Sequence, residues 1–317
     1  MTPPAVFIGI DVSKGQLDVG QAPVAPAWFV RNDAEGIRNL VGRIRNLKPA
    51  LVVLEATGGY ESALVAGLMA AALPVVVVNP RQVRDFAKAK NRLAKTDKID
   101  AQVLAEFGEA VRPELRPLPD GAQQELSSLL HRRQQLVEML TAEKNRSQLA
   151  SPAVRKDIKA HIAWLEKRLK DLNRELDQRI RSTPGWREKD DLLQAEKGVG
   201  PVLSFVLLAD LPELGHLNRK KISTLVGLAP LNHDSGQFRG KRKIWGGRPG
   251  VRAALYMPTL AATRHNPTIR PFYERLVAAG KPEKVAITAC MHKLLVMLNA
   301  KVRDAMLPPD LAFQHSC

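Results

Sequence analysis

Short apolar runs alternate with helix-like segments along the first 110 residues of the chain. Runs with the length and residue types of β-strands occur at 6–10, 16–20, 27–30, 51–54 and 75–78. Between the third and fourth runs, apolar residues from Ile37 to Ile44 recur at helical spacing, and Asn32 or Asp33 can cap that helix. Further helices are predicted from about 61 to 71 and from near Lys98 onward.

The predicted order of these elements is βββαβαβα, with the last strand ending at Asn79-Pro80. Three strands in a meander, followed by helices that cross over to parallel strands, are the layout of the ribonuclease H-like fold. We therefore predict an N-terminal α/β domain of this kind.

From about Gly121 to Arg181 the pattern becomes helical throughout. One apolar seam runs from Leu126 to Leu140, and after a break at Ser151-Pro152 a second runs from Ile158 to Ile180 with spacings of three and four. This pattern predicts a helical hairpin or coiled coil. Arg and Lys occupy many of its other positions. These basic side chains form either a solvated helix face or a surface that binds a nucleic-acid backbone.

Four helices are predicted in the remaining part of the chain, at 202–209, 222–226, 251–262 and 285–298. The whole pattern predicts an α/β plus α protein with three domains. They are an α/β domain over 1–112, a helical spacer over 113–185 and an α-rich domain over 186–317.

The charge balance indicates a polyanionic partner. The 317 residues include 48 Lys and Arg against 32 Asp and Glu, a net charge of +16. Residues 1 to 120 hold 15 basic and 13 acidic side chains and the remainder 33 and 19, so the two parts carry +2 and +14. We expect a nucleic acid to bind mainly to the C-terminal two thirds.

Composition excludes several other classes of protein. A hydrophobic content of 45% excludes wholesale disorder. The two cysteines, Cys290 and Cys317, exclude a disulfide scaffold, offer no zinc-ligand spacing and fit a reducing compartment. No signal peptide and no apolar stretch of roughly 18 residues is recognised, so we expect a cytoplasmic protein without membrane contact.

Four carboxylates of the first domain stand at the ends of predicted elements. Asp11 and Glu55 each follow a strand, and Asp97 and Asp100 share one face of a helix start. Carboxylates from three elements suit Mg²⁺, which takes oxygen ligands and can assist phosphoryl transfer. Each also has a local alternative, as a turn former or as a capping or first-turn residue. Glu61 competes with Glu55 but is predicted to lie inside a helix.

These segments resemble the DEDD-type insertion-sequence transposases, the IS one-ten family of bridge-RNA-guided DNA recombinases. The matching segments are GIDVSK, LEATGGYE, VNPRQVRDFAKAKNRLAKTDKIDAQVLAEF, DSG and RAALYMP. The resemblance spans nearly the whole chain. It implies a RuvC-like nuclease domain, a helical spacer and a transposase domain that supplies a nucleophilic serine.

The resemblance places that serine at Ser235, within Asp234-Ser235-Gly236. It implies that Ser235 attacks a DNA phosphate while the four carboxylates hold Mg²⁺. A serine hydroxyl needs activation by a base or a metal, and a glycine lets a DNA backbone approach closely. Nearby cations are candidates for phosphate contacts: Arg239, Lys241, Arg242, Lys243 and Arg248.

The chain departs from the family pattern at two places. Ile244 is followed by Trp245-Gly246-Gly247, where members of the family carry a serine or threonine and then a lysine. Arg248 is expected to supply the basic contact instead. Lys197-Gly198-Val199-Gly200 stands where the family has a Pro-Gly-Ile-Gly turn, which resembles a helix-hairpin-helix loop.

The partners implied by the resemblance are double-stranded target and donor DNA and a noncoding bridge RNA. Recombination cuts four strands, so one serine per chain predicts a homodimer that assembles to a homotetramer. An aromatic content of 5% favours recognition of backbone and shape. Two alternatives stay open: a RuvC-like junction nuclease that hydrolyses DNA without Ser235, and a nonenzymatic nucleic-acid-binding protein.

Overall fold

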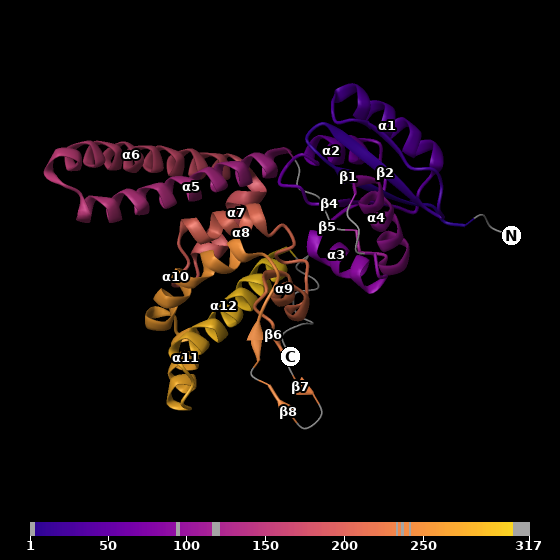
Figure 1. Ribbon diagram of the computed structural model, residues 1–317. Coiled ribbons are helices and arrows are strands. Elements are labelled where there is room, and N and C mark those ends of the chain that lie inside the picture. Colours follow the sequence, from indigo (N-terminus) through magenta and orange to yellow (C-terminus); the bar gives the residue numbers. More distant parts are fainter. Residues whose placement is uncertain are drawn as a thin grey trace. The chain divides into compact units, whose positions relative to one another are not determined.

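The computed structural model describes residues 4–92, 96–115, 121–232, 234–235, 238–240 and 242–306 (Figure 1). It contains two compact units, Met1–Arg116 and Pro117–Cys317. The first unit is a mixed α/β structure and the second is helical, as the hydrophobic pattern predicts.

A five-stranded sheet with the order β3-β2-β1-β4-β5 forms the centre of the first unit. Its strands are β1 (Phe7–Val12), β2 (Gln16–Ala22), β3 (Trp28–Arg31), β4 (Leu51–Glu55) and β5 (Val75–Val78). The first three pair antiparallel, while β4 is parallel to β1 and β5 is parallel to β4. The predicted meander and the two parallel crossovers are therefore confirmed.

The helices of the first unit are α1 (Ala34–Leu47), α2 (Ser62–Ala70), α3 (Pro80–Ala89) and α4 (Asp97–Val111). Asp33 caps α1 by accepting a hydrogen bond from the Gly36 N–H at 2.8 Å. Helix α3 was not predicted, because Asn79-Pro80 was taken only as the end of a strand. Asn79 instead caps α3, and Pro80 occupies a first turn in which its missing N–H costs no helical hydrogen bond.

Helix α4 lies very close to strands β1 and β2. A Cβ atom on Gly9 would lie 2.2 Å from the Ala101 carbonyl oxygen, so only glycine permits this approach. The Gln102 side chain then accepts a hydrogen bond from the Gln21 N–H at 3.3 Å and donates one to its carbonyl oxygen at 3.0 Å. These contacts fix the position of α4, and with it the acidic start of the helix, against the sheet.

The second unit begins with a hairpin of two long helices, α5 (Gly121–Leu149) and α6 (Pro152–Ser182), which run side by side in opposite directions (Figure 1). The break at Ser151 is where the sequence predicts it. Buried leucines hold the helices together, and Arg133 donates a 2.7 Å hydrogen bond across them to Asn173.

The rest of the second unit packs against the base of this hairpin in one continuous core. Its helices are α7 (Pro184–Gln194), α8 (Pro201–Asp210), α9 (Arg219–Val226), α10 (Pro249–His265), α11 (Ile269–Ala278) and α12 (Glu283–Met306). Its two-residue strands are β6 (Pro230–Leu231), β7 (Asp234–Ser235), β8 (Phe238–Arg239) and β9 (Lys243–Ile244). Neither α7 nor α11 is predicted from the sequence. Pro184 and Gly185, which indicate a break in the helical pattern, form the first turn of α7.

Helix α12 is long and apolar enough to cross a membrane, and is the one such helix in the described part of the chain. Half of its apolar window is buried in the structure. Cys290, Leu294 and Leu298 on this helix are fully buried in the core of the second unit. Its apolar character is therefore explained by its central place in that core.

Candidate active site

Two of the predicted carboxylates, Asp11 and Glu55, lie at the carboxyl ends of neighbouring strands. Ile10 of β1 pairs with Leu54 of the parallel strand β4, and Asp11 and Glu55 are the next residues on those strands. Both residues are partly exposed. The sheet thus presents two acidic residues side by side at one edge, as expected from the strand ends.

The other two carboxylates, Asp97 and Asp100, lie in the first turn of α4. Thr96 is the N-cap, and its hydroxyl accepts a hydrogen bond from the Ile99 N–H at 3.3 Å. The local alternative that made Asp97 the cap is therefore wrong. The helix dipole favours negative charge at this end, which lowers the cost of placing two carboxylates there.

The electrostatics of Asp11 link all four carboxylates. The pKa of Asp11 is raised from 3.8 to about 6, first by burial and then by the negative charges of Asp100, Asp97, Glu55 and Asp18. The structure therefore places Asp97, Asp100 and Glu55 within electrostatic reach of Asp11. Within the described ranges, no group of three or more His, Cys, Asp or Glu side chains is arranged so that it could hold a metal ion.

Sequence reasoning missed Asp18, the fifth carboxylate of this cluster. Asp18 is buried on β2 directly opposite Asp11, and it accepts a 2.8 Å hydrogen bond from the Gln16 side chain. The short turn over 13–15 determines this register. That turn was the signal from which the pairing of Asp11 with Asp18 could have been found.

A single side chain connects the two loops that follow Asp11 and Glu55. The Asn32 amide donates to the Ser13 carbonyl oxygen at 2.8 Å and to the Tyr60 carbonyl oxygen at 3.3 Å. Because each loop follows one of the carboxylate-bearing strands, Asn32 limits how far the two carboxylates can separate. The sequence suggested Asn32 only as a possible helix cap.

Glu61 closes the loop after Glu55 and does not lie inside α2, contrary to prediction. Its carboxylate accepts hydrogen bonds from the Thr57 hydroxyl at 2.5 Å, the Thr57 N–H at 3.2 Å and the Gly59 N–H at 2.9 Å. Burial acts to raise the pKa of Glu61, but these hydrogen bonds outweigh it and lower that pKa below its usual value. Glu61 is therefore a structural anion of the site loop.

The connection between α3 and α4 is anchored by a second buried anion, Glu106. Lys90 contacts its carboxylate at 2.5 Å and Arg92 at 2.9 Å. Burial alone would raise the pKa of Glu106, whereas the hydrogen bond from Lys90 and the charge of Arg92 lower it. This network holds Lys90 and Arg92, just after the end of α3, against α4, and nothing in the sequence indicates it.

The predicted nucleophile, Ser235, is exposed on strand β7 of the second unit. It pairs with Phe238 of β8, and Asp234 accepts a 3.1 Å hydrogen bond from the Gly240 N–H. Among the predicted basic contacts, Arg242 and Lys243 are exposed. Gly236, Lys241 and the side chain of Arg239 lie outside the described residues.

Arg248 has an internal role that the sequence did not predict. Its guanidinium donates to both carboxylate oxygens of the buried Glu213, at 2.6 and 2.7 Å, and to the Asp210 carbonyl oxygen at 2.8 Å. A phosphate would have to displace this bidentate pair. The expected phosphate contact is therefore better assigned to the exposed Arg242 and Lys243.

The Lys197–Gly200 turn connects α7 to α8. Gly198 has a φ of 102°, and a Cβ atom there would lie 2.8 Å from the Cβ of Ala262. Asn266 secures the turn by donating to Glu196 at 2.5 Å and to the Lys197 carbonyl oxygen at 3.0 Å. Glycine is thus required here by both conformation and packing.

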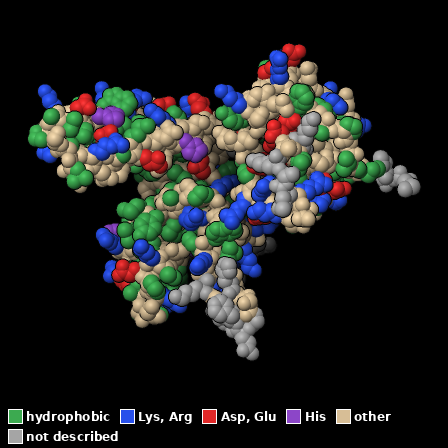
Figure 2. Space-filling model, in the orientation of Figure 1, with side chains coloured by type: hydrophobic (Ala, Val, Ile, Leu, Met, Phe, Trp, Pro, Cys, Tyr) green, Lys and Arg blue, Asp and Glu red, His purple; other side chains and the backbone are tan. Residues whose placement is uncertain are grey.

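Some of the basic side chains of the hairpin pair with acidic ones. Figure 2 shows acidic and basic side chains interspersed along it. Lys144 pairs with Glu166 at 2.8 Å, Arg174 pairs with Asp171 at 3.2 Å, and Arg179 pairs with Glu125. Because other basic side chains of α6, such as Lys159 and Lys167, are exposed, the two interpretations left open by the sequence both stand.

The four carboxylates lie at adjoining strand ends and at a helix start, the arrangement expected of a DEDD-type site, and the exposed Ser235 lies on β7 of the second unit. Comparison with protein families agrees: residues 8–150 match a transposase family of the DEDD IS110 type. Residues 190–274 match the transposase IS116/IS110/IS902 family. The chain belongs to the IS110 family of transposases and is a DNA transposase or recombinase.

Relatives of similar length support this assignment. The chain is 28% identical over 309 residues to the pilin gene-inverting protein of Moraxella bovis. The aligned region covers 94% of this chain and 96% of the relative. The protein of the same name from Moraxella lacunata matches with the same identity and coverage. A 42 kDa protein of insertion element IS900 from Mycobacterium paratuberculosis is 28% identical over 166 residues, 50% of this chain and 39% of that protein.

Proposed function

We propose that this transposase cuts and rejoins DNA through a covalent phosphoserine intermediate on Ser235, assisted by Mg²⁺ at a RuvC-like domain and guided by a noncoding bridge RNA. The observation that carries the catalytic part is the placement of Asp11 beside Glu55 at neighbouring strand ends, where the charges of Glu55, Asp97 and Asp100 act on Asp11. Negative charges that act on one partly buried carboxylate are unfavourable by themselves, and a divalent cation would offset them.

The donor set fits a hard metal ion. All four residues offer carboxylate oxygens, and the raised pKa of Asp11 reflects negative charge that a cation would offset. DEDD-type family membership also suggests the use of a divalent metal. Bound Mg²⁺ would supply polarisation of the scissile phosphate and stabilisation of the leaving oxygen. Asn32, Glu61 and Glu106 would keep the elements that carry these carboxylates in place.

The chemistry assigned to Ser235 conserves phosphodiester bonds. Its Oγ forms a bond to phosphorus as the bond to one DNA oxygen breaks, the hydroxyl proton is lost to water, and the departing oxygen takes one up. The hydroxyl of the partner strand then attacks the phosphoserine and releases Ser235. No external energy is needed, because each broken phosphodiester is replaced by another ester bond.

The proposed partners are target and donor duplexes, a noncoding bridge RNA and further copies of the chain. The charge of +14 beyond residue 120 supports nucleic-acid binding by the second unit, with Arg242 and Lys243 exposed near Ser235 in the sequence. The names of the Moraxella relatives indicate gene inversion, which supports cutting and rejoining over simple hydrolysis. Four strand cuts with one serine per chain support assembly of homodimers into a homotetramer that acts in the cytoplasm, at the nucleoid.

A denaturation-resistant adduct between protein and DNA is the test. Wild-type protein, with RNA, DNA and Mg²⁺, is expected to form it, whereas Ser235→Ala forms none and still binds DNA. Asp11→Ala and Asp97→Ala should lose cleavage and keep binding. Cleavage by Ser235→Ala without an adduct would favour the hydrolytic junction nuclease. Binding without cleavage by the wild type would favour the nonenzymatic alternative.

A further inference from the structure

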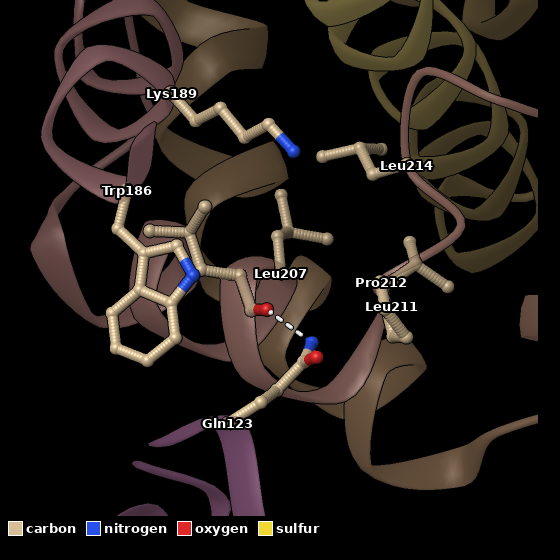
Figure 3. Close-up of a pocket in the computed structure, with 8 residues that line it drawn as sticks. Gln123, Trp186, Lys189, Leu207, Leu211, Pro212 and Leu214 are labelled. Atoms are coloured by element: carbon tan, nitrogen blue, oxygen red, sulfur yellow. Dashed lines mark hydrogen bonds between the residues drawn. The ribbon is translucent and has the colours of Figure 1, made fainter. Parts of the chain in front are cut away.

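A small cavity in the second unit lies between the start of α5, helix α7 and the end of α8 (Figure 3). Its volume is about 110 Å³. It is lined by Gln123, Trp186, Lys189, Leu207, Leu208, Leu211, Pro212 and Leu214. Most of the lining residues are apolar by type, but polar atoms make up at least as much of the cavity surface as apolar atoms, so the cavity offers a flat group both apolar contact and polar partners.

Lys189 introduces a positive charge into these apolar surroundings. Its side chain extends across the cavity with the ammonium directed toward Leu214 (Figure 3). Among the described residues the Lys189 ammonium has no ion-pair or hydrogen-bond partner, and burial lowers its pKa. A partly desolvated cation without a counter-ion destabilises the fold, and an anion bound beside it would remove that cost.

The indole of Trp186 is a second donor without an acceptor. Trp186 is half-buried, and within the described ranges its ring N–H makes no hydrogen bond. Gln123 differs, because its amide donates to the Leu208 carbonyl oxygen at 3.1 Å and thereby holds α5 against the end of α8. The two donors on α7 therefore lie beside leucine side chains of α8 and of the segment that follows it.

We propose that this cavity binds one unpaired nucleotide of the nucleic-acid substrate, with its phosphate on Lys189 and its base against Trp186 and the leucines. The volume admits a single planar ring and excludes a base pair. Aromatic and apolar surfaces bind unstacked bases independently of sequence, while a cation holds the adjoining phosphate. This inference rests on the proposed function and adds a binding site for distorted or looped nucleic acid.

The experiment uses the full chain with Trp28, Trp164 and Trp245 replaced by Phe, so that Trp186 alone reports by fluorescence. The probes are a duplex with one unpaired nucleotide, the fully paired duplex and the same bulge with an abasic residue. We expect Trp186 emission to change with the bulged duplex, and affinity for it to exceed the affinity for the other two. Lys189→Met should weaken bulge binding about tenfold.

Lys159→Met is the matched control, because Lys159 is an exposed lysine of α6 in the same unit. It should change bulge affinity less than twofold. Lys189→Met should also keep or raise the Tm, since it removes an unpaired charge, whereas a lower Tm would assign Lys189 to folding and overturn the proposal. Equal binding of the abasic bulge, or an effect of Lys189→Met no larger than the control, would overturn it too.

Two further outcomes separate this site from the proposed function. Adduct formation on Ser235 with a silent Trp186 would refute the nucleotide site and leave the recombinase mechanism standing. A change in Trp186 emission on protein self-association without nucleic acid would mean that a carboxylate of another copy occupies the cavity. That outcome would also refute the nucleotide site.

Discussion

The Thr57 hydroxyl donates a 2.5 Å hydrogen bond to the carboxylate of Glu61, four residues further along the chain. This bond closes the loop that follows Glu55, so a residue outside the four predicted carboxylates determines how one of them is presented. Glycines at positive φ make the tight loop possible, with Gly58 at 79° and Gly59 at 122°.

Replacing Glu61 by Ala is expected to lower the free energy of unfolding by about 1–3 kcal/mol, because the donors of Thr57 and Gly59 lose their common acceptor. Affinity for Mg²⁺ should fall as well, since Glu55 loses its supporting loop. Urea unfolding and calorimetric Mg²⁺ titration measure the two effects. Glu35→Ala, an exposed residue of α1, is the control. Unchanged metal affinity in Glu61→Ala would show that the loop does not position Glu55.

Replacing Asp11 by Asn is expected to stabilise the metal-free protein at pH 7 by about 1 kcal/mol. The pKa of Asp11 is about 6 in the folded state against 3.8 for the unperturbed group, so its charge destabilises the fold above pH 6. Two pKa units correspond to roughly 3 kcal/mol at most, and screening of this partly exposed group reduces that value.

The stabilising effect of Asp11→Asn should shrink as the pH falls from 6 toward 4, because the wild-type carboxylate then becomes neutral. Urea unfolding without metal at pH 7 and pH 4.5 measures this difference. Asp85→Asn, in exposed ion pairs of the same unit, should show no such gain. A destabilised Asp11→Asn at pH 7 would contradict the raised pKa.

Substitution of Arg248 is expected to lower stability, whereas substitution of Arg242 and Lys243 is expected to weaken DNA binding. Arg248→Gln leaves the buried Glu213 without its bidentate partner and should cost about 3–5 kcal/mol of stability. Arg242→Gln with Lys243→Gln should leave the Tm unchanged and lower the salt slope of DNA binding by about 2. Thermal unfolding and binding at several salt concentrations distinguish them. A salt slope unchanged by the double substitution would remove these two cations from the interface.

Mixing Asp11→Ala and Ser235→Ala proteins, each inactive alone, is expected to restore part of the recombination activity on RNA and DNA. The reason is that a tetramer can combine the intact carboxylate site of one chain with the intact serine of another. Recombination assays on co-assembled variants measure the recovery. Complete failure in verified mixed oligomers would mean that each active site is built within one chain.

Local chemistry and periodicity made much of this protein predictable. Alternating apolar runs determined the meander and the crossovers, and the seams from Leu126 to Leu140 and from Ile158 to Ile180 determined the hairpin. Asp11, Glu55, Asp97 and Asp100 could be selected because strand ends and helix starts have local sequence signals.

Only the tertiary structure decided which partners the charged residues contact. Asp18 faces Asp11 through strand register, Glu106 meets Lys90 and Arg92 across two helices, and Arg248 meets Glu213 rather than solvent. A charged residue looks the same in sequence whether its partner is a phosphate or a buried carboxylate. That choice depends on which distant segments the core brings together and on how much water it leaves between them.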